Sequence, residues 1–120
     1  MRVQAFGYAI DTPGRRIVIS GDTAPTMAVA EACHGCDVLV HEVYSAERFS
    51  ERFPPGVRSY HTAFHTSTTE LASMAAKARP KLLVLYHQLY FGSPEGVDLV
   101  KEIRATYSGA VVNGQDLSIY

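Results

Sequence analysis

The sequence predicts an α/β fold in which helices are layered on a sheet. Short β-branched and leucine-rich runs alternate along the chain with segments that carry helix signals. The central runs lack polar alternation, which is typical of strands buried on both faces. With 120 residues, of which 47% are hydrophobic and 19% are charged, the chain has enough apolar surface for one core. We therefore expect a single domain over residues 1–120.

Six segments have the composition of strands. The first two flank a turn that contains Pro13 and Gly14, which predicts a hairpin. The next two are continuous apolar runs, as expected in the middle of a sheet, and the last two are short. The expected strands cover residues 2–10, 16–20, 37–41, 81–87, 110–112 and 117–120.

Helix signals lie between these strands. The clearest is the capping box Ser67-Thr68-Thr69-Glu70, behind which an apolar face follows at helical spacing. Residues 60–66 have no helical pattern, so His61, four residues before His65, is expected to be peripheral. The expected helices run over residues 25–34 and 45–52, from 67 to about 78, and from 93 towards 107.

Two cysteines, Cys33 and Cys36, form a single CxxC motif. This motif is compatible with a redox pair or with half of a zinc site. A structural zinc site needs four ligands, however, and the sequence has no second CxxC. We expect two ordinary cysteines at a helix end and a strand start.

Charge and hydropathy argue against several classes of partner. Eleven Lys and Arg residues against twelve Asp and Glu residues give a net charge of −1, without a basic cluster. This balance argues against nucleic acid as a partner. No apolar run reaches the roughly 18 residues that a membrane span needs, and the N-terminus lacks the apolar segment of a signal peptide. We expect a soluble, cytoplasmic protein with no membrane partner.

Three of the expected strands end in residues that can bind a metal ion. Asp22 follows the second strand, His41-Glu42 follows the third, and His87 ends the fourth. Parallel strands would bring these ends to one edge of the sheet, where α/β proteins bind ligands. His65 lies just before the capping box, near a helix N-terminus. One aspartate and several histidines suit an ion such as zinc or manganese.

Most of these residues also have a purely structural explanation. Asp22 could cap the helix that follows it, because a carboxylate favours the positive end of the helix dipole. His41 could be a hydrogen-bonded core histidine, and Glu42 a solvated loop carboxylate. His65 could bond locally within its loop. Packing alone is a poor explanation for His87, which ends a strongly apolar strand.

Taken together, the motifs resemble the second half of the metallo-β-lactamase superfamily, most closely its ribonuclease Z and arylsulfatase-like branch. They are Gly21-Asp22-Thr23, His41-Glu42 after an apolar strand, His65-Thr66-Ser67 before a helix, and a second strand that ends in His87. The resemblance covers nearly the whole chain. It implies half of an αββα sandwich, with a mixed sheet and helices on one face.

The resemblance also implies roles for the individual residues. Asp22 matches an aspartate that bridges two metal ions, and His87 matches the last metal-binding histidine. His65 matches the histidine that contacts the scissile phosphate or sulfate and protonates the leaving group. His41 and Glu42 match a pair that supports the site, and His41 is a further candidate ligand. The cofactor implied is a divalent metal ion, with zinc first and manganese or iron as alternatives.

One motif of the superfamily is absent from the sequence. His-x-His-x-Asp-His, the first metal motif, does not occur. We predict a metal-dependent hydrolase of phosphate, sulfate or related small esters, whose site is completed by dimerisation. A sheet that normally packs on a second sheet would expose an apolar face, which favours a homodimer or a higher homo-oligomer. The alternative is a non-catalytic interaction module or an inactive fragment of such a hydrolase.

Overall fold

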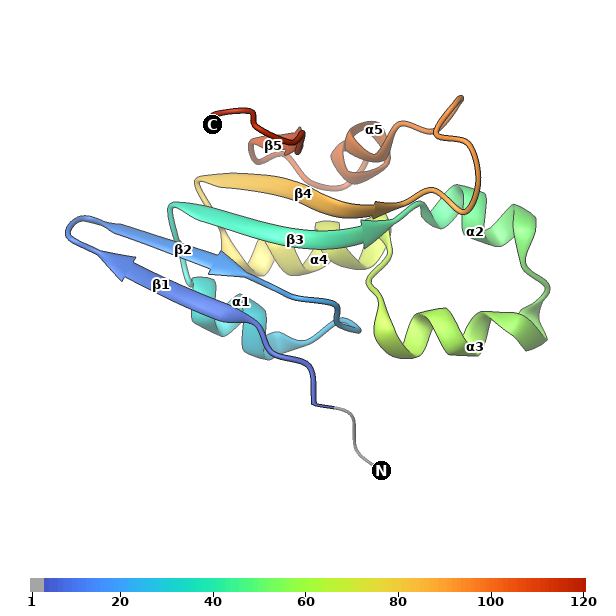
Figure 1. Cartoon of the computed structure of the whole chain (residues 1–120), viewed down its shortest axis with the longest axis horizontal. Coiled ribbons are helices and arrows are strands. Elements are labelled where there is room, and N and C mark those ends of the chain that lie inside the picture. Colours follow the sequence, from blue (N-terminus) through green and yellow to red (C-terminus); the bar gives the residue numbers. More distant parts are fainter. Residues whose placement is uncertain (1–3) are drawn as a thin grey trace.

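The computed structural model describes residues 4–120 and contains a five-stranded mixed sheet of order β1-β2-β3-β4-β5 (Figure 1). β1 is antiparallel to β2, and the remaining neighbours are parallel. The predicted α/β class and mixed sheet are confirmed. Residues 2 and 3 of the first expected strand lie outside the described part. The strands are β1 (Tyr8–Thr12), β2 (Arg15–Ile19), β3 (Val38–Tyr44), β4 (Leu82–Leu89) and β5 (Val111–Asn113).

The two continuous apolar runs form β3 and β4, the central pair of the sheet. In their register, Leu39 lies opposite Leu83 and Val40 lies opposite Val84. Successive side chains on a strand point to opposite faces, so these two pairs lie on different faces of the sheet. Leu39 and Leu83 are fully buried in the main core.

Three helices cover one face of the sheet and bury that core. The capping box predicted for the longest of them is present: the Ser67 side chain accepts from the Glu70 N–H, and the Glu70 carboxylate accepts from the Ser67 N–H. Apolar side chains of all three helices pack on β2, β3, β4 and β5. The helices are α1 (Met27–Cys33), α4 (Thr68–Ala78) and α5 (Leu99–Arg104).

The opposite face of the sheet remains partly open at β1. Tyr8 and Ile10 are exposed and pair in register with Ile19 and Ile17 of β2. Paired residues share a face, so these four apolar side chains lie on the side away from Val18, which is buried under the helices. The layering predicted from the sequence, with helices on one face, is present.

Two further helices, α2 (Ala46–Arg52) and α3 (Pro55–Phe64), lie beyond the carboxyl end of β3 (Figure 1). The prediction that residues 60–66 are not helical was wrong for the residues up to Phe64. The prolines that follow the helix expected at residues 45–52 are compatible with its end, but proline also suits a first helical turn, where its missing N–H is not needed. Here Pro54 is the N-cap and Pro55 begins α3.

Cys33 and Cys36 form a disulfide, where the sequence analysis expected two ordinary cysteines. Both residues are buried at the junction between α1 and β3. His34 and Gly35 between them have φ angles of 39° and 79°. This left-handed turn reverses the chain, which allows the two sulfur atoms to meet.

The C-terminal elements are shorter than expected. α5 begins at Leu99, where the Asp98 carboxylate accepts from the Lys101 N–H, rather than near residue 93. The strand expected at residues 117–120 does not form; instead the Tyr120 hydroxyl accepts from the Gln115 N–H. None of the helices formed by residues 4–120 is long and apolar enough to cross a membrane.

Candidate metal centre

Asp22 lies in a tight turn at the carboxyl end of β2. Gly21 before it has a φ of 65°, and a Cβ there would collide with the Phe6 carbonyl oxygen, so only glycine fits. The alternative role of Asp22 as a helix cap does not apply. The cap of α1 is Thr26, whose hydroxyl accepts from the Ala28 N–H. The Asp22 carboxylate is exposed and is not used as a helix cap, so it can bind a ligand.

His87 occupies an irregular position in β4. The register with β3 pairs Glu42 with Tyr86 and then Val43 with Gln88, so His87 has no partner. Its φ is 43°, a left-handed value that is uncommon for a residue other than glycine. An extra residue of this kind is a β-bulge, which changes the direction of a side chain. The bulge leaves the His87 imidazole exposed at the end of the strand.

His65 ends α3 and begins the extended segment that leads to α4. Its N–H donates to the His61 carbonyl oxygen, which closes the last turn of the helix. The next residue, Thr66, is tied to the end of β3, because its carbonyl oxygen accepts from the Tyr44 N–H. His65 is thus held beside the carboxyl edge of the sheet from both sides.

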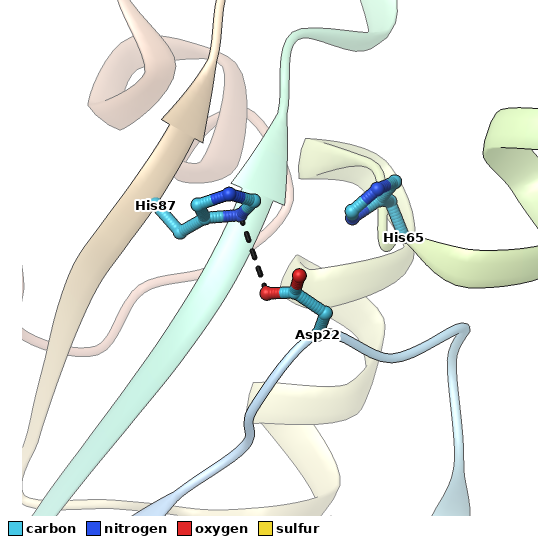
Figure 2. Close-up of side chains that lie close together, drawn as sticks. All are labelled: Asp22, His65 and His87. Atoms are coloured by element: carbon cyan, nitrogen blue, oxygen red, sulfur yellow. Dashed lines mark ion pairs between the residues drawn. The ribbon is translucent and has the colours of Figure 1, made fainter. Parts of the chain in front are cut away.

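Asp22, His65 and His87 converge at this edge (Figure 2). One possible ligand atom from each lies within 4.8 Å of the others. The Asp22 Oδ1 to His87 Nδ1 distance is 3.4 Å, and the ring centroids of His65 and His87 are 5.8 Å apart. Three elements distant in sequence therefore supply one cluster of donors.

The donor set fits a divalent metal ion. Ligand atoms at about 2.1 Å from a tetrahedral zinc ion lie about 3.4 Å from each other, close to the spacing between Asp22 and His87. Burial lowers the pKa of His65, which favours the neutral imidazole that binds metals. Two imidazoles and a carboxylate suit zinc, manganese or iron, and they leave coordination positions open.

Glu42 lies directly behind this cluster and is fully buried. Its Oε1 accepts from the N–H groups of Thr23 and Thr66, and it lies 3.4 Å from His65 Nδ1. Burial raises the pKa of Glu42 to about 8, although the two N–H donors act in the opposite direction. The carboxyl group therefore joins the Asp22 turn to the His65 segment, and it is not a solvated loop residue.

His41 is not part of the cluster that the structure brings together. Its ring is fully buried, with Nδ1 2.7 Å from the Glu42 carbonyl oxygen and no partner for Nε2. Burial lowers the pKa of His41 to about 4, so the ring is neutral at pH 7. In β3 it shares a face with Leu39, towards the helices, whereas Glu42 lies on the opposite face.

An aromatic pair beside the centre was not predicted from the sequence. Tyr60 and Phe64 of α3 line an open cavity of about 440 Å³ together with Asp22 and His65. His61, expected to be peripheral, lies on the same helix and packs against other aromatic rings, with its ring centroid 4.9 Å from that of Phe91. Two aromatic residues at i, i+4 spacing directly before His65 were the available signal.

Comparison with known protein families gives a match over most of the chain. The β-lactamase superfamily domain matches residues 1–88. Among individual relatives, a ribonuclease Z of Haloarcula marismortui is 38% identical over 104 residues, covering 87% of this chain and 31% of that protein. A ribonuclease Z of Myxococcus xanthus is 35% identical over 99 residues, covering 82% of this chain and 30% of that protein.

Solved structures show the same fold. The metallo-β-lactamase fold protein YhfI from Bacillus subtilis superposes with a TM-score of 0.68 at 22% identity, covering 89% of this chain and 40% of that one. Human tRNase Z, short form, gives a TM-score of 0.53 at 25% identity, covering 68% of this chain and 30% of that one. The chain thus spans about a third of the length of the ribonuclease Z relatives named above.

These relatives overturn one prediction and leave another without support. Nucleic acid was argued against as a partner, but the matching relatives are named ribonuclease Z and tRNase Z. A net charge summed over the sequence omits the positive charge of bound metal ions, which is often the largest local charge in such a site. Small phosphate or sulfate esters gain no support, because these relatives are named as nucleases.

Proposed function

This chain belongs to the β-lactamase superfamily, in the ribonuclease Z branch of its metallo-β-lactamase fold, and on that premise we propose that it forms part of a metal-dependent ribonuclease. The observation that carries the proposal is the convergence of Asp22, His65 and His87 at the carboxyl edge of the sheet. Transfer RNA is the first substrate to test, since a tRNase Z is among the similar structures.

Asp22 and His87 would hold the metal ion, and His65 is close enough to act as a third ligand or as an acid. A divalent ion bound there supplies positive charge for the phosphate oxygens and lowers the pKa of bound water. The side chains of Asp22 and His87 are exposed, so a substrate phosphate can reach a metal ion bound to them. The exposed position of His87 at the bulge is essential to this arrangement.

Where His65 is not a metal ligand, it is the proposed proton donor to the leaving oxygen, in the protonated form that the negative charge of a bound phosphate would favour. In the hydrolysis of a phosphodiester, the oxygen of water bonds to phosphorus and releases one proton to solvent, the P–O bond of the leaving group breaks, and the leaving oxygen takes up a proton from His65. Glu42 Oε1 lies 3.4 Å from His65 Nδ1 without a hydrogen bond between them, and in this proposal it would orient the ring. It would do so from a position held by the Thr23 and Thr66 N–H groups.

The remaining ligands would come from outside this chain. The sequence lacks the His-x-His-x-Asp-His motif, so the residues present account for part of a two-metal site. A second copy of this chain, packed on the open sheet face at β1, is one source. A further polypeptide segment, such as the part of the ribonuclease Z relatives that this chain does not span, is another.

The test measures metal content and RNA cleavage together. Wild-type chain is loaded with zinc or manganese, dialysed, analysed for metal by elemental analysis, and incubated with labelled transfer RNA. We expect about one ion or more per chain, and loss of both metal and cleavage in Asp22→Ala. Asp116→Ala, which removes an exposed carboxylate from the C-terminal tail, is the matched control and should change neither.

Two results would contradict the proposal. One is a folded wild-type chain that retains no metal and cleaves no RNA, which would favour the non-catalytic module. The other is cleavage that persists unchanged in Asp22→Ala after extensive treatment with a chelator. Sedimentation of the same samples shows whether activity follows a dimeric fraction.

A further inference from the structure

Tyr60 and Phe64 form an aromatic pair on the surface of α3. They lie one helical turn apart, with ring centroids 5.2 Å from each other. Their relative exposures are 67% and 47%, high values for rings of this size. Large aromatic side chains left in water beside a functional site commonly serve a ligand or a partner.

The pair does not hold α3 in place. No residue of this helix is fully buried. The helix is attached by Arg58, which donates to the carbonyl oxygens of Phe53 and Ser50, and by the His61 ring, which packs on Phe53 and Phe91. Removing the Phe64 ring would leave all of these contacts intact, whereas the Tyr60 ring also packs edge-on against His61, with ring centroids 5.4 Å apart.

The pair faces the same space as the candidate metal centre. Tyr60 and Phe64 line a cavity of about 440 Å³ together with Ala5, Asp22 and His65 among the described residues. Cavities of this size commonly bind small molecules or one unit of a larger ligand. Phe64 also directly precedes His65. The part of a ligand that packs on the two rings would therefore be adjacent to the part that His65 contacts.

The lining indicates which part of a nucleic acid fits. Among residues 4–120, the lining contains no Lys or Arg. It offers instead two aromatic rings, on which a planar, uncharged base can stack. Every base has a π face, and stacking on an aromatic side chain contributes about 1–3 kcal/mol for each base.

We propose that Tyr60 and Phe64 are a stacking platform for a nucleobase of the RNA substrate, next to the phosphate that is cleaved. The inference rests on the proposed function for its choice of RNA. It adds a substrate-binding element on α3 that orients the strand before cleavage. Because stacking tolerates every base, the platform would bind single-stranded RNA with little preference for sequence.

The test measures binding without metal, so it does not depend on activity. A short single-stranded RNA with one 2-aminopurine is titrated with metal-free chain, and quenching of the fluorescence reports stacking. We expect Tyr60→Leu and Phe64→Leu each to raise the Kd at least about fivefold, since leucine keeps apolar area but has no π face. Tyr60→Phe should bind like the wild type. Val57→Ala, an exposed position one turn earlier on α3, is the matched control.

Thermal unfolding of each variant by circular dichroism shows whether α3 and the core are retained. The inference is overturned if the wild-type chain does not quench the probe, if Val57→Ala weakens binding as much as the leucine variants, or if the leucine variants bind normally. It is also overturned if the rings prove to be a dimer contact, with the leucine variants monomeric and RNA binding unchanged. Failure of the proposed function looks different: binding depends on Tyr60, but the metal-loaded chain cleaves no RNA.

Discussion

β3 and β4 are parallel neighbours, and each contains a histidine, His41 in the middle of β3 and His87 near the carboxyl end of β4, but the two histidines have opposite environments. His41 is buried on the helix side of β3 in regular strand geometry, with a pKa lowered to about 4. His87 is the unpaired residue of a bulge in β4, and its ring is exposed beside Asp22. Similar sequence contexts therefore give a core residue in one strand and a candidate metal ligand in the other.

The difference shows that one extra residue in a strand decides whether a histidine ring is buried in the core or exposed at the sheet edge. Without the bulge, His87 would lie opposite Val43, which is buried in the main core. A single-residue shift in register moves a side chain to the other face of the sheet. The left-handed φ at His87 is the local cost of placing its imidazole at the sheet edge.

The largest expected effect separates the two histidines by metal binding. His87→Ala removes a donor from the cluster, so we expect zinc affinity to fall by at least about a hundredfold. His41→Asn leaves Asp22, His65 and His87 unchanged and should alter affinity by less than about threefold. Competition titration with a chromophoric chelator measures both. Equal losses in the two variants would show that His41 belongs to the site.

Glu42 immediately precedes the shift in register and should have the next largest effect. Glu42→Ala leaves the buried N–H of Thr66 and the partly buried N–H of Thr23 without an acceptor, and we expect a loss of about 3 kcal/mol in the free energy of unfolding. Glu42→Gln keeps an acceptor oxygen and should lose about 1 kcal/mol. Urea unfolding at pH 7 measures both values. Similar losses for the two substitutions would argue against hydrogen bonding as the cause.

The pH dependence of stability should report the buried histidine, His41. The folded-state pKa of His41 is lowered from 6.5 to about 4, so the unfolded chain binds a proton first as the pH falls. Between pH 7 and pH 5 this destabilises the folded state by about 2 kcal/mol. His41→Asn should lack this contribution.

Because Glu42 also contributes to the pH dependence of stability, the His41 contribution must be measured as a difference between the wild type and His41→Asn. Its raised pKa makes the folded state bind a proton first, so its contribution to stability is lost as the pH rises from 4.5 through about 8. The two residues therefore act in opposite directions between pH 4.5 and 6.5. Subtracting the unfolding free energies of His41→Asn from those of the wild type at each pH isolates the histidine. A flat difference would contradict the prediction.

The smallest expected effect concerns the residue after the bulge. The Gln88 side-chain amide donates to the carbonyl oxygens of Leu85 and Gly114, which ties the end of β4 to the chain after β5. Gln88→Ala should lose about 1 kcal/mol in the free energy of unfolding and keep its metal ion. Chemical unfolding and elemental analysis check the two parts. Loss of metal with unchanged stability would mean that Gln88 acts on His87 directly.

Much of the fold was predictable because its signals are local. The apolar runs of β3 and β4 and the capping box of α4 predicted the central sheet and its longest covering helix, and these are present. α3 was missed because a Pro-Pro-Gly sequence serves equally well to end one helix and to begin another. The strand expected at residues 117–120 needed a neighbour to pair with, and pairing is not a local property.

The candidate site was predictable in its residues and less so in its geometry. Strand ends identified Asp22 and His87, and the position just before the capping box identified His65; the structure brings these three together. His41 was grouped with them because strand ends converge, but the alternation of side chains places it on the other side of the sheet. His87 differs because it lies in a bulge. The bulge is defined by the pairing of β4 with β3, and a single sequence gives no information on strand pairing.

The three donors also link ion binding to the folding equilibrium. Asp22, His65 and His87 come from three segments that only the folded chain brings within 4.8 Å. An unfolded chain offers no such constellation, so an ion at a hundred times its dissociation constant would add about 2.7 kcal/mol to stability. Chelators should therefore lower the melting temperature, and the size of that shift reports metal affinity without any substrate. Melting curves recorded with different divalent ions would therefore rank the affinities of the chain for those ions.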